Sequence, residues 1–155
     1  SLYAAVPSGR VETRTLVYKQ VSYTGIDGLD DIGSTYIEVD MTDQMMYYYV
    51  NGRQELSTPV VTGNTSLGRG TPQKVCYIYF KQRNRVLRGE DYATPVSYWM
   101  AVYGNIGIHD ATWRRKFGGS IYKTGGSHGC INTPFDEVSK LYDMAEVGTP
   151  VIIFY

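Results

Sequence analysis

Residues 36–52 read Tyr-Ile-Glu-Val-Asp-Met-Thr-Asp-Gln-Met-Met-Tyr-Tyr-Tyr-Val-Asn-Gly, and this stretch carries the clearest structural pattern in the chain. Its first five residues alternate as a strand does, and Met41-Thr42-Asp43 marks a turn. The tyrosine-rich run that follows ends in Asn51-Gly52, a strong hairpin signal. We expect the return strand over residues 53–62, with Pro59 at an edge or a bulge because proline cannot donate to a ladder.

Further strands are predicted on the C-terminal side of this hairpin. Apolar, β-prone residues mark strands over 75–80, 96–103, 106–109 and 151–155, with a turn at Gly104-Asn105. Residues 81–88 carry four cations and are interpreted as a solvated hairpin end or loop. Residues 110–126 are expected to form a long, irregular connection.

One helix is predicted, directly after residues 127–132. Thr133 can cap it, and Pro134 suits its first helical position. Apolar residues then recur at helical spacing before Gly148: Phe135, Val138, Leu141, Tyr142 and Ala145. Together, the predicted strands and helix indicate a mainly β fold, a mixed sandwich or partly open barrel, with one principal α-helix after the cysteine at position 130.

Length and composition fit one domain. The chain has 155 residues, enough to bury most of the apolar surface of the unfolded chain. Lys+Arg and Asp+Glu are balanced at 15 each, so no electrostatic footprint favours nucleic acid or an anionic membrane. No apolar run approaches the about 20 residues that span a bilayer. The 15 tyrosines suit strands and also grooves that bind extended polar ligands.

The first 33 residues differ in character from the rest. They are turn-rich, and Val17, Val21 and Tyr23 could form a short edge strand. We interpret residues 1–33 as a lead-in from an upstream region that is missing here, and residues 34–155 as the domain. An anchor or export signal is expected upstream.

A cysteine and a histidine supply the candidate catalytic chemistry. Cys130 lies in Ser127-His128-Gly129-Cys130-Ile131-Asn132, and His109 ends a predicted strand. A thiol with a pKa near ~8.5 needs a base to become a nucleophile, and a distant histidine brought close by folding supplies one. The side chain of Asp110, or a nearby backbone carbonyl, could orient the imidazole. The N–H groups of Gly129 and Cys130 are candidate oxyanion donors for acyl transfer through a thioester.

Other interpretations of these residues stay open at this point. His128 could be the base in place of His109. A metal site is chemically feasible, although the spacing of its donors matches no familiar pattern: His109, Asp110, His128 and Cys130.

Cys76 lies in an apolar, β-prone run and is expected to be a buried, inert thiol. A disulfide between Cys76 and Cys130 would silence the proposed nucleophile. Trp113 and Tyr92 belong to residue types that more often pack than contact ligands.

Two stretches resemble a known family. Ile108-His109-Asp110-Ala111-Thr112-Trp113 and residues 127–132 are similar to the signature of the L,D-transpeptidase (YkuD) catalytic domain family. In that pattern a histidine precedes Ser/Thr-His-Gly-Cys, a small or apolar residue and Asn. Four supporting stretches are similar too: 35–40, 59–64, Thr71-Pro72 and 148–151. The likeness covers roughly residues 12–155.

The resemblance implies a mixed β-sandwich catalytic domain that remodels bacterial peptidoglycan outside the cytoplasmic membrane, in the cell wall or anchored at the membrane. Cys130 would attack the carbonyl that joins the third residue of a tetrapeptide stem to its terminal D-alanine. An amine on a neighbouring stem would then resolve the thioester into a cross-link between third residues. His109 would be the general base, oriented by the main chain of Asp110 rather than by its carboxylate.

The remaining roles are also implied by the resemblance. Gly129 and Cys130 would supply oxyanion donors, and His128 would support the turn. The residues expected near the substrate are Tyr92 (as an aromatic lid), Trp113, Ser127 and Asn132, the last two also shaping the turn. No metal and no cofactor are expected. Stem peptides and carbapenem-type β-lactams are the expected partners of a monomer.

Two alternative functions remain at this stage. An L,D-carboxypeptidase would let water resolve the same thioester, and the motif residues do not separate it from a transpeptidase. An inactive cell-wall binding module is the second alternative, and the intact Cys130 and His109 motif argues against it.

Overall fold

The structure is a computed structural model that describes residues 33–155. The predicted lead-in and its edge strand at Val17, Val21 and Tyr23 lie outside the described residues. Within the described part, no helix is long and apolar enough to cross a membrane.

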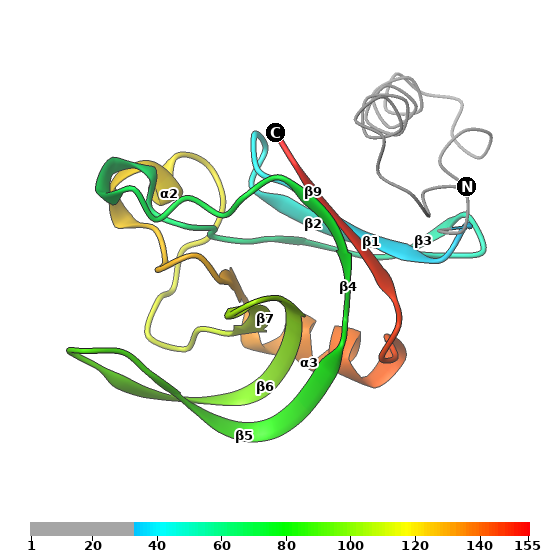
Figure 1. Ribbon diagram of the computed structural model, residues 1–155. Coiled ribbons are helices and arrows are strands. Elements are labelled where there is room, and N and C mark those ends of the chain that lie inside the picture. Colours follow the sequence, from blue (N-terminus) through cyan, green and yellow to red (C-terminus); the bar gives the residue numbers. More distant parts are fainter. Residues whose placement is uncertain (1–32) are drawn as a thin grey trace.

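Two β-sheets form the domain (Figure 1). The five-stranded sheet has the order β3-β2-β1-β9-β4. Its strands are β1 (Tyr36–Asp40), β2 (Met45–Val50), β3 (Arg53–Pro59), β4 (Lys74–Tyr77) and β9 (Pro150–Phe154). The four-stranded sheet has the order β5-β6-β7-β8. Its strands are β5 (Phe80–Arg88), β6 (Ala93–Tyr103), β7 (Ile106–Asp110) and β8 (Ile131–Thr133). The predicted mainly β, two-sheet fold class is confirmed.

The hairpin predicted at Asn51-Gly52 is present. Both residues have positive φ, 51° and 80°, as a type I′ turn requires, and Val50 pairs with Arg53 across it. The return strand is shorter than predicted, since β3 ends at Pro59, opposite the first residue of β2. Residues 60–64 instead run beside residues 127–132, with which they form two isolated bridges.

Residues 81–88, interpreted as a solvated hairpin end or loop, instead belong to strand β5, which pairs antiparallel with β6. The charges of Arg83 and Arg85 are accommodated by aromatic rings on the neighbouring strand β6. The guanidinium carbon of Arg83 lies 4.2 Å from the ring centre of Tyr98, and that of Arg85 lies 5.1 Å from that of Trp99.

Two short helices were not predicted. The 3₁₀-helix η2 (Thr65–Leu67) and helix α2 (Ile121–Gly125) contact each other. The connection over residues 110–126 is therefore less irregular than expected. In Figure 1 α2 lies on the same side of the molecule as the loop that precedes β4.

The principal helix, α3 (Phe135–Met144), follows β8 at once, as predicted, but its ends differ from the prediction. Pro134 occupies the N-cap position, and Thr133 belongs to β8, where its hydroxyl donates to the carbonyl of Ile131. At the C-terminus Lys81 Nζ donates to the carbonyls of Tyr142 and Ala145, at 2.6 and 2.7 Å. A cation at this end complements the helix dipole, and the helix ends at Met144 rather than near Gly148.

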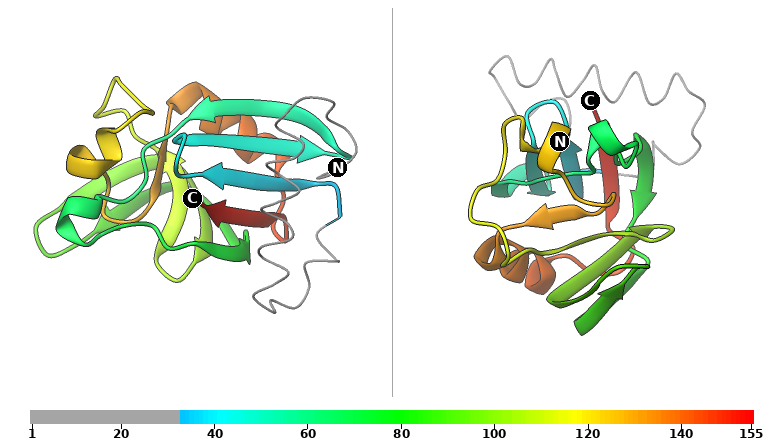
Figure 2. Two further views of the ribbon diagram at one scale, coloured as in Figure 1. Left: turned by 90° about the horizontal axis from the view of Figure 1, so that it is seen from above. Right: turned by 90° about the vertical axis from the view of Figure 1, so that its left-hand side faces the viewer.

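Helix α3 and both sheets share one hydrophobic core. Val138, Leu141 and Ala145 are fully buried there, together with Ile37 of the five-stranded sheet and Met100 of the four-stranded sheet. Figure 2 shows the strands of the larger sheet side by side from above, and α3 close to β8 from the side. The helix thereby fixes the position of β8 and of the loop that precedes it.

Candidate active site

The loop that carries Cys130 is closed by a serine side chain. Ser127 Oγ donates to the carbonyl of Cys130 at 2.5 Å and accepts from the Gly129 N–H at 3.1 Å. Gly129 has a φ of 130°, a conformation that favours glycine. Ser127 and Gly129 thus shape the turn. The Gly129 N–H, predicted as an oxyanion donor, points at Ser127 Oγ here, and its role in catalysis stays a prediction.

Residues 60–71 hold this loop from a second side. Val61 and Asn132 exchange two backbone hydrogen bonds of 2.9 Å each. Thr71 is buried, and its hydroxyl donates to the Gly129 carbonyl at 2.6 Å while it accepts from the Gly63 N–H at 2.9 Å. In the sequence, Thr71 belonged only to a stretch that resembles the family. Its contact with the loop over residues 127–132, which carries Cys130, was not predicted.

His109 lies on β7, only 2% exposed, and its ring is oriented by the backbone. Nδ1 lies 2.6 Å from the carbonyl oxygen of Asp110, so the Nδ1–H donates there and Nε2 keeps the lone pair. The Asp110 carboxylate is engaged elsewhere, because it accepts from the backbone N–H groups of Ser97 and Tyr98 at 2.8 to 3.0 Å. The group of Asp110 that contacts His109 is therefore its main-chain carbonyl and not its carboxylate.

Trp99 supports the other side of this imidazole. It is the cross-strand partner of His109, and the two rings stack with centroids 5.8 Å apart. The indole also covers Gly107, where a Cβ would lie 2.6 Å from the ring. Sequence reasoning missed Trp99, although the predicted turn at Gly104-Asn105 brings it near His109.

Burial favours the neutral form of both reacting groups. Burial lowers the pKa of His109 from its ordinary value of 6.5, more than its contacts with Asp110 raise it. Burial also raises the pKa of the Cys130 thiol above 9.0, although the Gly107 N–H and the charge of Arg85 oppose this shift. Deprotonating Cys130 therefore requires a base at the moment of reaction.

A cavity of about 290 Å³ brings most of the predicted site residues together. We call it the His109 cavity. Its predicted lining residues are Tyr92, His109, Trp113, Ser127, His128, Cys130 and Asn132. Gly129 and Asp110 lie behind this lining, in contact with Thr71 and His109 respectively.

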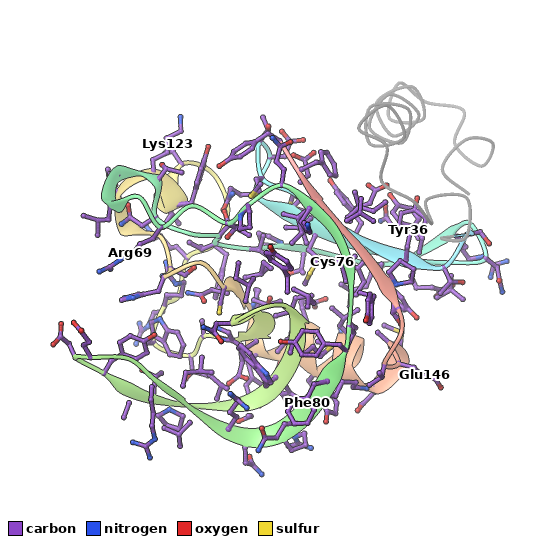
Figure 3. All side chains as sticks on the ribbon, in the orientation of Figure 1. Tyr36, Arg69, Cys76, Phe80, Lys123 and Glu146 are labelled. Atoms are coloured by element: carbon purple, nitrogen blue, oxygen red, sulfur yellow. The ribbon has the colours of Figure 1, made fainter. Side chains whose placement is uncertain are left out.

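His128 differs from His109 in its surroundings. It is exposed, its ring packs edge-on against Tyr92 with centroids 4.9 Å apart, and its Nε2 lies 3.3 Å from Arg69 Nη1. Figure 3 labels Arg69, which lies among the loops at the left of that view. These contacts join His128 to the rim of the cavity.

A second cavity, of about 640 Å³, adjoins the first. We call it the Arg85 cavity. Arg85, Arg88 and Asn105 line it, and it shares four residues with the His109 cavity: Leu87, Tyr92, His128 and Cys130. Cys130 therefore faces two adjoining spaces.

Arg114 is a site residue that sequence reasoning did not identify. With the Asn132 amide turned so that its oxygen faces Arg114, Nη2 and Nε donate to that oxygen at 3.1 and 3.2 Å. Its Nη1 donates to the Gly125 carbonyl at 3.1 Å. It lines the His109 cavity. Asn132 lies 18 residues away in the sequence, and no local pattern links the two.

The second cysteine lies apart from this site. Cys76 is on β4, its thiol is 3.6 Å from the Val151 carbonyl, and burial raises its pKa to about 12 (Figure 3). Both thiols are free. Among residues 33–155 no cluster of three or more His, Cys, Asp or Glu side chains could hold a metal ion.

Comparisons with known proteins agree with this geometry. The model of the L,D-transpeptidase catalytic domain matches residues 34–153. A solved mutant of the Enterococcus faecium L,D-transpeptidase is 42% identical with a TM-score of 0.75, over 78% of this chain and 50% of that one. The catalytic domain of the E. faecium enzyme, acylated by ertapenem, is 43% identical with a TM-score of 0.70. The match covers 79% of this chain and 98% of that one.

A more distant structure shares the fold. The L,D-transpeptidase from Mycobacterium smegmatis is 24% identical with a TM-score of 0.68, over 79% of this chain and 59% of that one. No curated protein sequence matches. The chain spans about half the length of the first E. faecium structure. The match over residues 34–153 and the arrangement around Cys130 show that the chain belongs to the L,D-transpeptidase catalytic domain family.

Proposed function

We propose that this domain is a peptidoglycan L,D-transpeptidase with Cys130 as nucleophile and His109 as general base. One observation carries the proposal. Cys130 and a buried His109, whose Nδ1 is bound to the Asp110 carbonyl, line the same cavity. This arrangement leaves Nε2 of His109 as the proton acceptor.

The first half-reaction forms a thioester. His109 Nε2 takes the thiol proton as sulfur attacks the carbonyl carbon between the third residue and the terminal D-alanine. The backbone N–H of Cys130, with that of Gly129 if it leaves Ser127, stabilises the oxyanion. The C–N bond breaks, and His109 returns its proton to the amine of the departing D-alanine.

The second half-reaction forms the cross-link. The side-chain amine of a neighbouring stem gives a proton to His109 and attacks the thioester carbonyl. The C–S bond breaks, and His109 reprotonates Cys130. The two cavities that meet at Cys130 favour this two-substrate reaction over hydrolysis, since each could hold one stem.

The products of a disaccharide-tetrapeptide test this assignment. We expect mass spectrometry to find free D-alanine and a cross-linked dimer. Tripeptide without dimer would contradict the transpeptidase assignment and favour the L,D-carboxypeptidase.

Carbapenem-type β-lactams are the proposed covalent inhibitors, because the structure of an E. faecium relative carries ertapenem as an acyl group. We expect intact-mass analysis to show an adduct on the native protein and on Cys76→Ser. Cys130→Ala should show none, and His109→Ala should lose acylation. A native protein that stays unmodified would instead favour an inactive binding module.

The location and assembly follow from the proposed substrate. Stem peptides are substrates outside the cytoplasmic membrane, so we propose an extracytoplasmic place of action. Tyr92, Trp113, Ser127 and Asn132 are the proposed contacts for these peptides, since all four line the His109 cavity. A monomer is proposed, and sedimentation of the purified chain would test it.

A further inference from the structure

Arg114 is a half-buried cation on the wall of the His109 cavity, without a charged partner. Within residues 33–155 it forms no ion pair, and its hydrogen bonds go to an amide oxygen and a backbone carbonyl. Burial lowers the pKa of its guanidinium, as expected for a cation that is partly desolvated and uncompensated. A desolvated cation of this kind favours an anion in the space it faces.

The guanidinium is held in place with donors to spare. Three N–H groups are used, by Nε, Nη1 and Nη2, towards Asn132 and Gly125. A guanidinium carries five, so each terminal nitrogen keeps one N–H group without a protein acceptor. A planar, pre-oriented guanidinium with donors on both terminal nitrogens suits a carboxylate.

Arg114 also lies close to His109. Both line the same cavity, and the charge of Arg114 is one cause of the lowered pKa of His109. In the proposed reaction His109 protonates the amine of the departing residue. The carboxylate of that residue is only two bonds from this amine, so it must lie within a few ångströms of His109.

We propose that Arg114 is the recognition residue for the C-terminal carboxylate of the donor stem, the carboxylate of the D-alanine that leaves. The assignment rests on the proposed function. Arg85 and Arg88 do not compete for this role, because they line the Arg85 cavity and not the His109 cavity. Asn132 then acts as a positioning residue, since it fixes the guanidinium plane.

Two donor peptides test the proposal: one tetrapeptide stem ending in D-alanine, and the same stem ending in D-alaninamide. The amide keeps the scissile bond and removes only the negative charge. We expect the wild-type domain to favour the carboxylate by about tenfold to a hundredfold in kcat/KM, the range that a charge-assisted hydrogen bond supports. Mass analysis of the tripeptide product gives both rates.

Variants separate recognition from a structural role. Arg114→Gln should bring the preference to within about threefold, chiefly by raising KM for the carboxylate donor, while Arg114→Lys should keep part of it. Arg115→Gln is the matched control, because Arg115 is the exposed neighbour, and it should keep the full preference.

The outcomes distinguish this proposal from the function on which it rests. Equal rates for both donors in the active wild type, or an unchanged preference in Arg114→Gln, would overturn the assignment of Arg114 alone. If Arg114→Gln does not fold, the wild-type preference and Arg114→Lys still decide. A wild-type domain that releases no tripeptide from either donor would contradict the transpeptidase function itself.

Discussion

The surroundings of Cys130 and His109 favour the neutral form of each residue rather than a stored thiolate–imidazolium ion pair. Burial acts on both residues in the same sense, against charge: it raises the pKa of the thiol and lowers that of the imidazole. The proton must then move during the attack on the substrate. Two predictions follow from these two residues, one for the pH dependence of alkylation and one for that of carbapenem acylation.

The first concerns direct alkylation of Cys130. Iodoacetamide reacts with the thiolate, so its rate should keep rising as the pH passes 9.0, because burial raises the pKa of Cys130 above that value. Peptide mapping separates Cys130 from Cys76, whose pKa of about 12 makes it slower still. A rate already constant near neutral pH would show that a stored thiolate exists.

The second concerns carbapenem acylation, in which His109 acts as base. A lowered pKa means that the imidazole stays neutral to a more acidic pH than 6.5 and is protonated only below it. Acylation should therefore persist at pH 6.5 and fall on further acidification, with a midpoint below 6.5. Stopped-flow rates across this range measure the midpoint, and a midpoint above 6.5 would contradict the burial argument.

At the scale of elements, the β6–β7 hairpin sets the position of His109 through a glycine. Gly107 has no Cβ, and the Trp99 ring that backs His109 occupies that space. Gly107→Ala would place a methyl 2.6 Å from the indole and displace it. We expect acylation to slow at least tenfold, with a loss of about 1–3 kcal/mol in unfolding free energy typical of overpacking.

Gly70→Ala is the matched control for this prediction. A Cβ there would meet only Thr65 Cγ2, at an ordinary 3.4 Å, so both activity and urea denaturation should stay near wild type. Equal effects of the two substitutions would argue against a specific role for the Trp99 contact.

The segment over residues 60–71 and the nucleophile loop form a second pair of elements, joined by Thr71. Thr71→Val keeps the shape but leaves the Gly129 carbonyl and the Gly63 N–H without their buried partner. Each orphaned group costs about 1–3 kcal/mol, so we expect lower stability in urea and slower carbapenem acylation. Thr65→Val, at an exposed position, should change neither.

At the scale of the whole molecule, helix α3 connects the two sheets. Leu141 is fully buried in the core that both sheets share. Leu141→Ala should lower the unfolding free energy by about 2–5 kcal/mol, the cost of a large-to-small change in a packed core. Urea denaturation measures this, and Val147→Ala, at a side chain 58% exposed, serves as control.

A small loss for Leu141→Ala, comparable to that of the control, would mean that α3 contributes little to the shared core. The acylation rate should also fall in Leu141→Ala, since α3 directly follows β8 and supports the loop that carries Cys130.

The sequence by itself determined the parts of this protein that depend on neighbours along the chain. Alternation and turn chemistry predicted β1, the Asn51-Gly52 hairpin and the β6–β7 pair. Helical spacing predicted the buried Val138 and Leu141 of α3 but wrongly included Phe135, which is 41% exposed. Strand and helix patterns act over a few residues, so a single chain shows them directly. The Cys130 and His109 motif was also visible there.

Only the tertiary structure decided the features that join distant residues. Strand β5 was interpreted as a hairpin end or loop, because the groups that accommodate its cations lie on other elements. Arg83 and Arg85 face rings on β6, and Lys81 binds carbonyls at the end of α3. Thr71 reaches Gly129 across 58 positions, and Arg114 meets Asn132 only once β7, α2 and β8 are packed. Such contacts have no periodicity in the sequence. They arise because burial forces polar groups to find partners wherever the fold brings them together.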